Sequence, residues 1–315
     1  MRIVVMGSGG TGGYFGAKLA RAGEDVTFVA RGAHLVAMRE HGLRIKSAIE
    51  GESVVKVAAV ERLDGLPAAD LVLFCVKSFD TESAAEAIRP VVGPGTGVLS
   101  IQNGVDNEDK LARILGPGHV LGGVAQVFAT IEAPGVIAHM LLGRILLGEM
   151  DGTETERARA FLAVCGRAEI PAEISNQIVR TLWEKYVYLV AQSGMTGLTR
   201  CTAGVLRALP ETRAMYRRIV DEMVALGEAE GAGLVGDYAD QCMTILDAIG
   251  PNASSSLHHD LTHGKRIELE ALQGHAVRLG ERHRVKTPTL LDVYAALRPH
   301  RDGASAPAAA GGSRA

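Results

Sequence analysis

The sequence is poor in aromatic residues and in cysteine. Phe, Trp and Tyr together make up 4% of the 315 residues, which argues against the aromatic platforms that stack nucleic-acid bases. The four cysteines, Cys75, Cys165, Cys201 and Cys242, lie far apart and form no Cys-x-x-Cys pair. This spacing argues against a disulfide framework and against a zinc site, so we expect no bound metal.

Long apolar runs and blocks of basic charge are also missing. No uninterrupted apolar stretch reaches the ~20 residues of a membrane-spanning helix, and the first apolar run is too short for a signal peptide. Lys and Arg number 33 against 36 Asp and Glu, which gives a formal net charge of −3. We therefore expect a cytoplasmic protein that binds neither membranes nor nucleic acids.

The first half of the chain alternates between short apolar strands and helices. We expect strands over residues 2–6, 25–30, 71–76 and 97–102, and helices over 12–22, 34–40, 81–88 and 106–115. Such alternation predicts the α/β class, with a Rossmann-type, doubly wound and mostly parallel sheet.

Two β-rich segments interrupt this alternation. Residues 43–57 are expected to form a hairpin with its turn near residues 50–52. Residues 120–149 have no helical period, and we expect them to form antiparallel strands that close the sheet edge.

Composition and periodicity also divide the chain. Hydrophobic residues make up 47% of it, and its length suits two domains of ordinary size. We expect a Rossmann-type cofactor-binding domain over 1–175 and an all-α domain, which binds substrate, over 176–300. The Ala- and Gly-rich tail, 301–315, is expected to be disordered.

A glycine-rich loop joins the first expected strand to the first helix. Its sequence fits G-x-G-x-x-G, the pattern of dinucleotide-binding sites, and we expect all six residues to contact the cofactor: Gly7, Ser8, Gly9, Gly10, Thr11 and Gly12. Gly7 permits the tight turn, Gly9 lets a pyrophosphate approach the backbone, and Gly12 lets the helix pack on the strand. Free N–H groups at the helix N-terminus favour the phosphates.

The end of the second strand indicates which dinucleotide is bound. An acidic residue there would bind the ribose 2′-hydroxyl of NAD, whereas Arg31, followed by Gly32, suits the 2′-phosphate of NADP. Asp25 begins this strand and is badly placed for the ribose. The sequence therefore predicts NADPH, with an exposed loop arginine of no special role as the alternative.

Two polar residues follow the next strands of the expected sheet. Lys77 and Asn103 come just after residues 71–76 and 97–102, at the carboxyl edge where open α/β sheets bind ligands. We expect both near the nicotinamide end of the cofactor. The alternative is that they are ordinary loop residues.

Two motifs in the helical half, Trp183-Glu184-Lys185 and the run from Ser255 to Glu268, add to those of the first half. With them, the chain resembles the ketopantoate reductase family, the 2-dehydropantoate 2-reductases. The resemblance covers about residues 1–298, and after the glycine loop its motifs are Ala30-Arg31-Gly32, Val76-Lys77, Gln102-Asn103-Gly104, Trp183-Glu184-Lys185 and the run from Ser255 to Glu268. It implies NADPH-dependent reduction of a 2-keto acid to a 2-hydroxy acid, with 2-dehydropantoate and pantothenate biosynthesis as the leading case.

The resemblance also implies residue roles. Lys185 would be the general acid, which suits the alkoxide-like oxygen that hydride addition creates. Glu268 would hold the substrate hydroxyl, orient the lysine and lie near the cofactor. Ser256 would bind the substrate carboxylate, Asn103 would lie near the reacting carbonyl, and Lys77 would lie near cofactor and substrate.

Lys185 and Glu268 also have plain structural alternatives. Most helical lysines are solvated, and Lys185 could be one of them. Helical spacing places Glu268 on an apolar face with Leu261 and Leu272, where its carboxylate needs a partner. That partner could simply be Lys265 at the surface.

The sequence departs from the family where the substrate is selected. Members usually carry asparagine four and eight residues after the lysine, but here these positions are Leu189 and Ser193. We expect Ser193 to bind substrate, and Gln192 could substitute in part for the missing amides. Leu189 removes hydrogen bonds and adds apolar volume.

Several functional alternatives therefore stay open. One is a paralogue that reduces a more apolar 2-keto acid or acts on a 3-hydroxy acid. Another is a non-catalytic NADP(H)-binding sensor, although a sensor has no reason to keep both Lys185 and Glu268. Both a monomer and a homodimer are consistent with the sequence.

Overall fold

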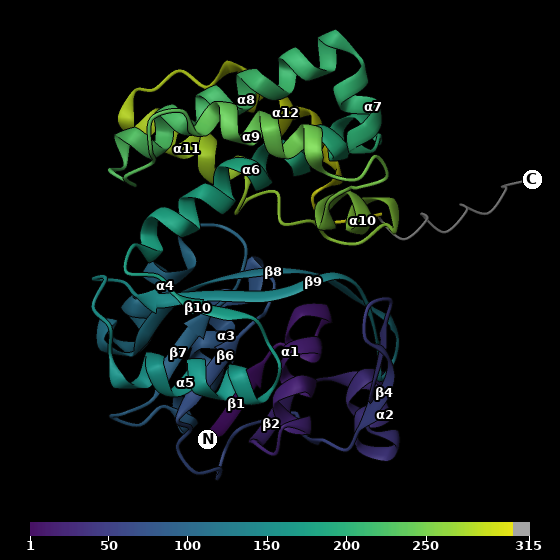
Figure 1. The fold of residues 1–315 in the computed structure, drawn as a ribbon, viewed down its shortest axis with the longest axis vertical. Helices are drawn as coiled ribbons and strands as arrows, with labels where there is room; N and C mark the ends of the chain where they lie inside the picture. The colour runs from purple at the N-terminus through teal and green to yellow at the C-terminus, as the bar shows by residue number, and fades with distance from the viewer. Residues whose placement is uncertain (305–315) are drawn as a thin grey trace, which may run out of the picture. The chain divides into compact units, whose positions relative to one another are not determined.

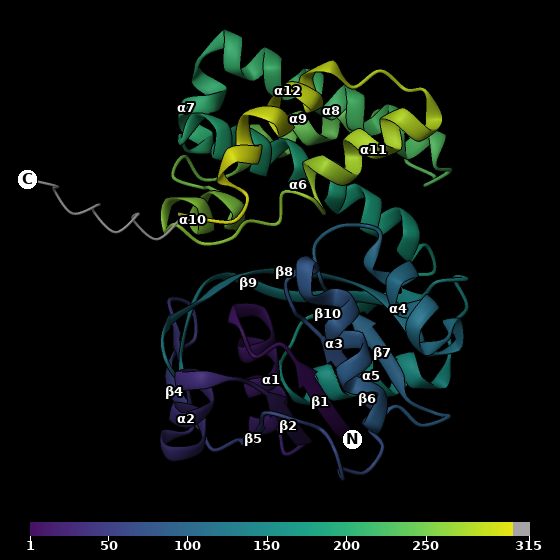
Figure 2. The same cartoon turned by 180° about the vertical axis from the view of Figure 1, so that it is seen from behind.

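The computed structural model describes residues 1–304, which form two compact units that divide between Leu182 and Trp183. Figure 1 and Figure 2 show a β-sheet with helices in the first unit, whereas the described part of the second unit is helical. The division falls within one long helix, α6 (Ile178–Thr199).

The sheet of the first unit has a parallel centre. Its strands run in the order β4-β3-β9-β8-β7-β6-β1-β2-β5, with β10 (Ala172–Ile174) paired to β9. The parallel strands at its centre and at one edge are β1 (Arg2–Met6), β2 (Asp25–Val29), β5 (Ala58–Val60), β6 (Leu71–Phe74) and β7 (Gly97–Ser100). β5 and β10 were not expected from the sequence.

Helices cover both faces of this sheet. Along β1, Ile3 and Val5 belong to one core cluster, and Val4 and Met6 belong to another. The first cluster takes side chains from α1 (Gly10–Arg21), α2 (Gly32–His41) and α5 (Glu156–Arg167), and the second from α3 (Thr81–Ile88) and α4 (Asn107–Leu115). A strand buried on both faces must be apolar throughout, and this confirms the predicted doubly wound α/β fold.

A long antiparallel hairpin lies inside the sheet rather than at its edge. Its strands are β8 (Val120–Ala133) and β9 (Val136–Glu149), so the predicted antiparallel pairing is confirmed. The predicted edge position is wrong, because β9 also pairs in parallel with β3 (Leu43–Ser47). β3 continues to the edge through its own predicted hairpin with β4 (Gly51–Val55).

The second unit continues α6 with further helices. They are α7 (Ala203–Ala208), α8 (Pro210–Ala229), α9 (Tyr238–Ala248), α10 (Ser256–Thr262), α11 (Gln273–His283) and α12 (Pro288–Leu297). Pro210 and Pro288 are the first residues of α8 and α12, where proline loses no helical hydrogen bond.

Short 3₁₀ turns and the end of the chain complete the fold. The turns are Ser78–Asp80, Arg89–Val91, Pro117–His119 and Arg298–His300. Of the tail expected to be disordered, residues 305–315 lie outside the described part. Two of its first four residues are hydrogen-bonded to the loop after α10, where Ile267 N donates to Arg301 O and Ala304 N donates to Gly264 O.

A carboxyl group is buried in the first turn of α4. Glu108 is almost fully buried, and its Oε2 has no hydrogen-bond partner among residues 1–304. Burial disfavours the charged form and raises the pKa of Glu108 to about 7. The folded state therefore holds a proton that the unfolded state releases at lower pH.

This linkage predicts a pH-dependent effect of Glu108→Gln. The protonated Glu108 carboxyl contributes its full stabilisation at pH values below the pKa that this group has in the unfolded chain. That contribution is lost as pH rises through about 7, the pKa of Glu108 in the folded chain. We expect the variant to be more stable than the parent at pH 8.5, by up to roughly 3 kcal/mol, and to differ far less at pH 5. Thermal melts at both pH values measure this. Asp109→Asn, an exposed neighbour, is the control, and a difference independent of pH would contradict the assignment.

Candidate active site

The candidate site of the first unit lies at the carboxyl edge of its parallel strands. Met6 lies opposite both Val29 and Phe74, and Phe74 lies opposite Ser100, so four strands end in line. The loops that follow carry Gly7, Arg31, Lys77 and Asn103. The register therefore brings together the residues that were predicted one by one from the ends of strands.

The glycine loop has one open position and three closed ones. A Cβ on Gly7, which has φ +99°, would lie 2.7 Å from Val76 N, and one on Gly12 would lie 2.2 Å from Gly7 O. A Cβ on Gly10 would lie 1.9 Å from Ala129 O of β8, whereas one on Gly9 meets nothing within 4 Å. Packing thus requires three of these glycines, while the space beside Gly9 remains for a ligand.

The start of α1 suits an anion. Its N-cap is Gly9, no side chain caps it, and its first turn holds no acidic residue. Its first N–H groups and its dipole therefore favour negative charge from outside the helix. Together with the opening at Gly9, this fits a dinucleotide pyrophosphate.

Ser8 and His34 fix the loop in place. The Ser8 hydroxyl donates to Val29 O at 2.8 Å, and His34 Nε2 donates to Ser8 O at 2.9 Å. Gly135 N, in the turn between β8 and β9, donates to His34 Nδ1 at 3.0 Å. Because Nδ1 accepts a hydrogen bond, it carries no proton in this arrangement. Burial lowers the pKa of His34, although its bond to Ser8 acts in the opposite direction. No sequence motif predicted this role of His34.

Arg31 and Thr11 lie beside this loop. Arg31 follows β2, is exposed, and is the N-cap of α2, so its guanidinium is accessible at the sheet edge. Thr11 lies in the first turn of α1 and is half-buried. Both positions are compatible with a dinucleotide at the glycine loop.

Gln102 clamps the loops that carry Lys77 and Asn103. Its Nε2 donates to Val76 O and to Thr81 Oγ1, at 2.9 Å in each case. Asn107 Nδ2 donates to Asn103 O at 2.9 Å. Lys77 and Asn103 are both half-buried at this edge, so the clamp restricts where their side chains can reach.

In the second unit, Lys185 and Glu268 lie on segments that are bonded together. Lys185 is half-buried on α6, next to the buried Tyr186. Tyr186 donates its hydroxyl hydrogen to Leu272 O at 2.7 Å, and Leu272 N donates to Glu268 O at 3.1 Å. The buried Glu268 is thereby held in a loop against the helix of Lys185.

The helical face predicted for Glu268 is wrong. Gly264 adopts φ +65° just after the C-cap of α10 and ends that helix. Glu268 then lies in the loop before α11, whereas Leu261 belongs to α10 and Leu272 is the N-cap of α11. These residues do not share the face of one helix.

The two predicted serines differ in their surroundings. Ser193 is fully buried, and its Oγ accepts from Gln273 Nε2 at 2.9 Å, so its substrate role stays a prediction. Ser256 is the half-buried first residue of α10. Its neighbour Ser255 accepts from His258 N at 3.0 Å and shares a hydrogen bond of 2.8 Å with Thr196 on α6. That bond ties the start of α10 to α6.

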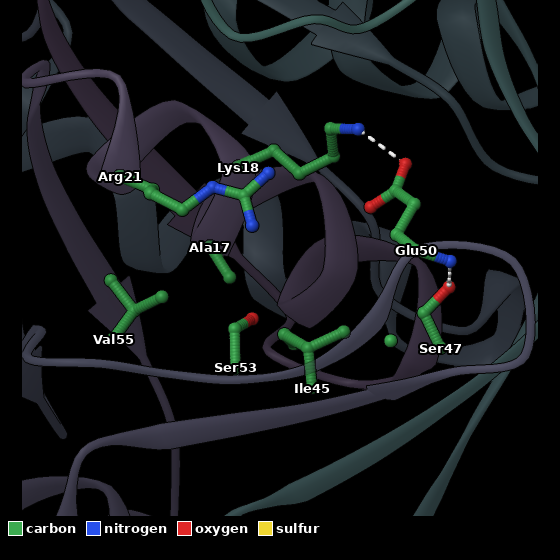
Figure 3. Close-up of a pocket in the computed structure, with 9 residues that line it drawn as sticks. Ala17, Lys18, Arg21, Ile45, Ser47, Glu50, Ser53 and Val55 are labelled. Carbon is green, nitrogen blue, oxygen red and sulfur yellow. Dashed lines mark hydrogen bonds and ion pairs between the residues drawn. The ribbon is translucent and has the colours of Figure 1, made fainter.

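A separate pocket in the first unit contains none of the predicted site residues. It lies between α1 and the β3–β4 hairpin (Figure 3), where Lys18 Nζ pairs with Glu50 Oε1 at 2.5 Å. Burial opposes ionisation of Glu50, but the hydrogen bond and charge of Lys18 outweigh it and lower the pKa of that carboxyl. The two charges satisfy each other, so the pair is explained as a structural contact.

Residues 1–304 contain neither a candidate metal cluster nor a membrane-spanning helix. In that range, no three or more His, Cys, Asp or Glu side chains gather in a way that could hold a metal ion. No helix there combines the length and the apolar composition needed to cross a membrane.

Family models and curated relatives of this chain carry the same description. Residues 3–152 match the family described as ketopantoate reductase PanE/ApbA, and residues 177–301 match its C-terminal counterpart. The 2-dehydropantoate 2-reductase of Mesorhizobium japonicum is 31% identical over 95% of this chain and 97% of its own. That of Archaeoglobus fulgidus is 33% identical over 89% and 91%.

Solved structures share the fold over nearly the whole chain. The PanE/ApbA family ketopantoate reductase of Ralstonia eutropha has a TM-score of 0.88 at 34% identity and covers 96% of this chain and 98% of its own. D-mandelate dehydrogenase with NADH and anilino(oxo)acetate has a TM-score of 0.87 at 21% identity, over 96% and 98%. The resemblance found in the sequence is confirmed: the chain belongs to the ketopantoate reductase family of nicotinamide-dependent oxidoreductases.

Proposed function

We propose that this protein is a reductase that uses NADPH to convert a 2-keto acid into a 2-hydroxy acid. The leading substrate is 2-dehydropantoate, reduced to pantoate in the cytoplasm as a step of pantothenate biosynthesis. The observation that carries the proposal is the tie between α6 and the loop of Glu268, because it keeps an ammonium and a carboxylate on neighbouring segments. The names of the relatives support the same reaction.

The chain's own groups account for the cofactor and the proton. The glycine loop and the start of α1 hold the pyrophosphate, and Arg31 binds the 2′-phosphate. NADPH, when bound, supplies a hydride to the carbonyl carbon. Lys185 donates a proton to the carbonyl oxygen as the C=O double bond becomes a single bond, and the lysine is left neutral.

The remaining residues position the substrate. Glu268 accepts a hydrogen bond from the substrate hydroxyl and orients Lys185. Ser256 donates to the substrate carboxylate, with Ser193 as a further contact. Asn103 and Lys77 lie at the carboxyl edge of the sheet, where Asn103 offers both a donor and an acceptor to the carbonyl region.

A more apolar 2-keto acid is the second candidate substrate. Leu189 lies one helical turn after Lys185 and is half-buried, so it offers apolar surface near the ammonium group. A branched or aromatic side chain would gain from that contact, whereas a hydroxyl would lose a hydrogen bond there. The rate of NADPH oxidation with a panel of 2-keto acids that includes 2-dehydropantoate decides between the two. Tight NADPH binding without turnover on any acid would instead support a sensor.

Removal of the proposed proton donor tests the mechanism. We expect Lys185→Ala to lower kcat by at least about a hundredfold, the usual scale for a positioned acid, while the variant still binds NADPH. Steady-state kinetics measure kcat, and cofactor fluorescence measures binding. Lys286→Ala, which removes an exposed lysine between α11 and α12, should leave both unchanged. A loss confined to KM would show that Lys185 only binds substrate.

The cofactor preference assigned to Arg31 has its own test. We expect Arg31→Ala to raise KM for NADPH by roughly 10- to 100-fold, the scale of a lost hydrogen bond between charged groups. KM for NADH should change little, because NADH has no 2′-phosphate. Arg113→Ala, on the exposed side of α4, serves as the control. Equal effects on both cofactors would remove the assignment.

Two alanine substitutions in the glycine loop distinguish a glycine that leaves room for a ligand from a glycine that is required for packing. Gly9→Ala places its Cβ in open space, so we expect an unchanged melting temperature but cofactor binding weakened by at least about tenfold. Gly10→Ala drives its Cβ into Ala129 O, so we expect loss of stability itself. Melting curves and cofactor titrations measure the pair. Full cofactor affinity in Gly9→Ala would show that no phosphate approaches this position.

A further inference from the structure

A buried amide on α6 lacks hydrogen bonds. Gln192 is 1% exposed, and neither its Nε2 nor its Oε1 has a partner within residues 1–304. Buried polar groups in folded proteins are almost always paired, because an unpaired one keeps the full cost of leaving water. In the described part of the chain, Gln192 is the one side chain with both amide atoms in this state. It therefore calls for a ligand.

The position of Gln192 connects it to the proposed chemistry. It follows Lys185 by seven residues, which places both on one face of α6, two turns and about 10 Å apart along the axis. Leu189 lies between them on that face. Helical side chains tilt toward the N-terminus, so the Gln192 amide leans toward Leu189 and Lys185.

The other end of this face meets the start of α10. Thr196, one turn after Gln192, donates to Gln192 O at 2.7 Å and shares its hydroxyl with Ser255 at 2.8 Å. Ser255 directly precedes Ser256, the proposed contact for the substrate carboxylate. Gln192 thus lies on a helical face that runs from the proposed proton donor to the proposed carboxylate contact.

The adjacent residue shows that the helical core can satisfy its polar groups. Ser193 faces α11, where Gln273 donates to it and to Val190 O. Gln192 receives nothing comparable, although it is equally buried. A glutamine kept without a partner inside a protein is explained when a bound molecule completes its hydrogen bonds.

We propose that Gln192 is a substrate-binding residue whose Nε2 donates a hydrogen bond to the carboxylate of the 2-keto acid, beside Ser256. Leu189, between Gln192 and Lys185 on the same face, then packs against the apolar part of the acid. The inference rests on the proposed function. It adds that Gln192 supplies the amide that selects the acid. Leu189 stands where members of the family usually carry such an amide.

Two variants test this role. Gln192→Met keeps the length and removes the hydrogen bonds, and we expect KM for the preferred 2-keto acid to rise at least about tenfold while kcat and KM for NADPH change less than about threefold. Its melting temperature should not fall, because an unpartnered buried amide is lost. Gln192→Glu places a carboxylate next to the carboxylate of the substrate. Because the two negative charges repel each other in a buried site, we expect a larger rise in KM that salt does not abolish.

A matched control removes another buried and unpartnered polar atom. Tyr216 on α8 is fully buried, and its hydroxyl has no partner among residues 1–304, so Tyr216→Phe should leave both the melting temperature and the kinetics unchanged. If Gln192→Glu does not fold, Gln192→Met alone decides.

The outcomes separate this inference from the proposed function. An unchanged KM in Gln192→Met, with normal turnover, overturns the role of Gln192 and leaves the reductase proposal standing. A fall in melting temperature together with equal losses in every kinetic constant assigns Gln192 a structural role, which also overturns it. Absence of turnover by the parent protein with any 2-keto acid overturns both.

Discussion

The parallel register of β1, β2, β6 and β7 is the constraint on which the first unit depends. Because these strands end in line, four loops that are distant in sequence meet at one edge. Backbone bonds across the ends, such as Cys75 N to Met6 O and Ile101 N to Phe74 O, prevent the loops from sliding apart. A slip of one residue would turn every side chain of a strand to the opposite face, and burial on both faces does not tolerate that.

The helical unit positions its polar groups by a different device. Tyr186 and Gln273 each reach backbone oxygen atoms across a helix contact, which fixes the loop of Glu268 and the start of α11 on α6. Thr196 does the same for the start of α10 through Ser255. Buried bonds of this kind have few competing geometries, so the segments they join are held in one arrangement.

Sequence patterns predicted most of the fold because periodicity and glycine spacing are local properties. The strand–helix alternation and the glycine loop required no knowledge of distant contacts. The position of the β8–β9 hairpin inside the sheet did, since β3 reaches it from far along the chain. The helix predicted around Glu268 failed because Gly264 ends α10 early, and apolar spacing alone does not register such a stop. His34 could not be predicted, because its role depends on two backbone groups from different loops.

The His34 bridge also limits how the protein can be altered. Residues 131–134 at the hairpin tip are exposed, and such a tip is usually a tolerant place for a purification tag or an inserted domain. Here the adjoining Gly135 is buried and bonded through His34 to Ser8 of the glycine loop. An insertion at this tip would thus be transmitted to the glycine loop, and fusion partners are better joined elsewhere.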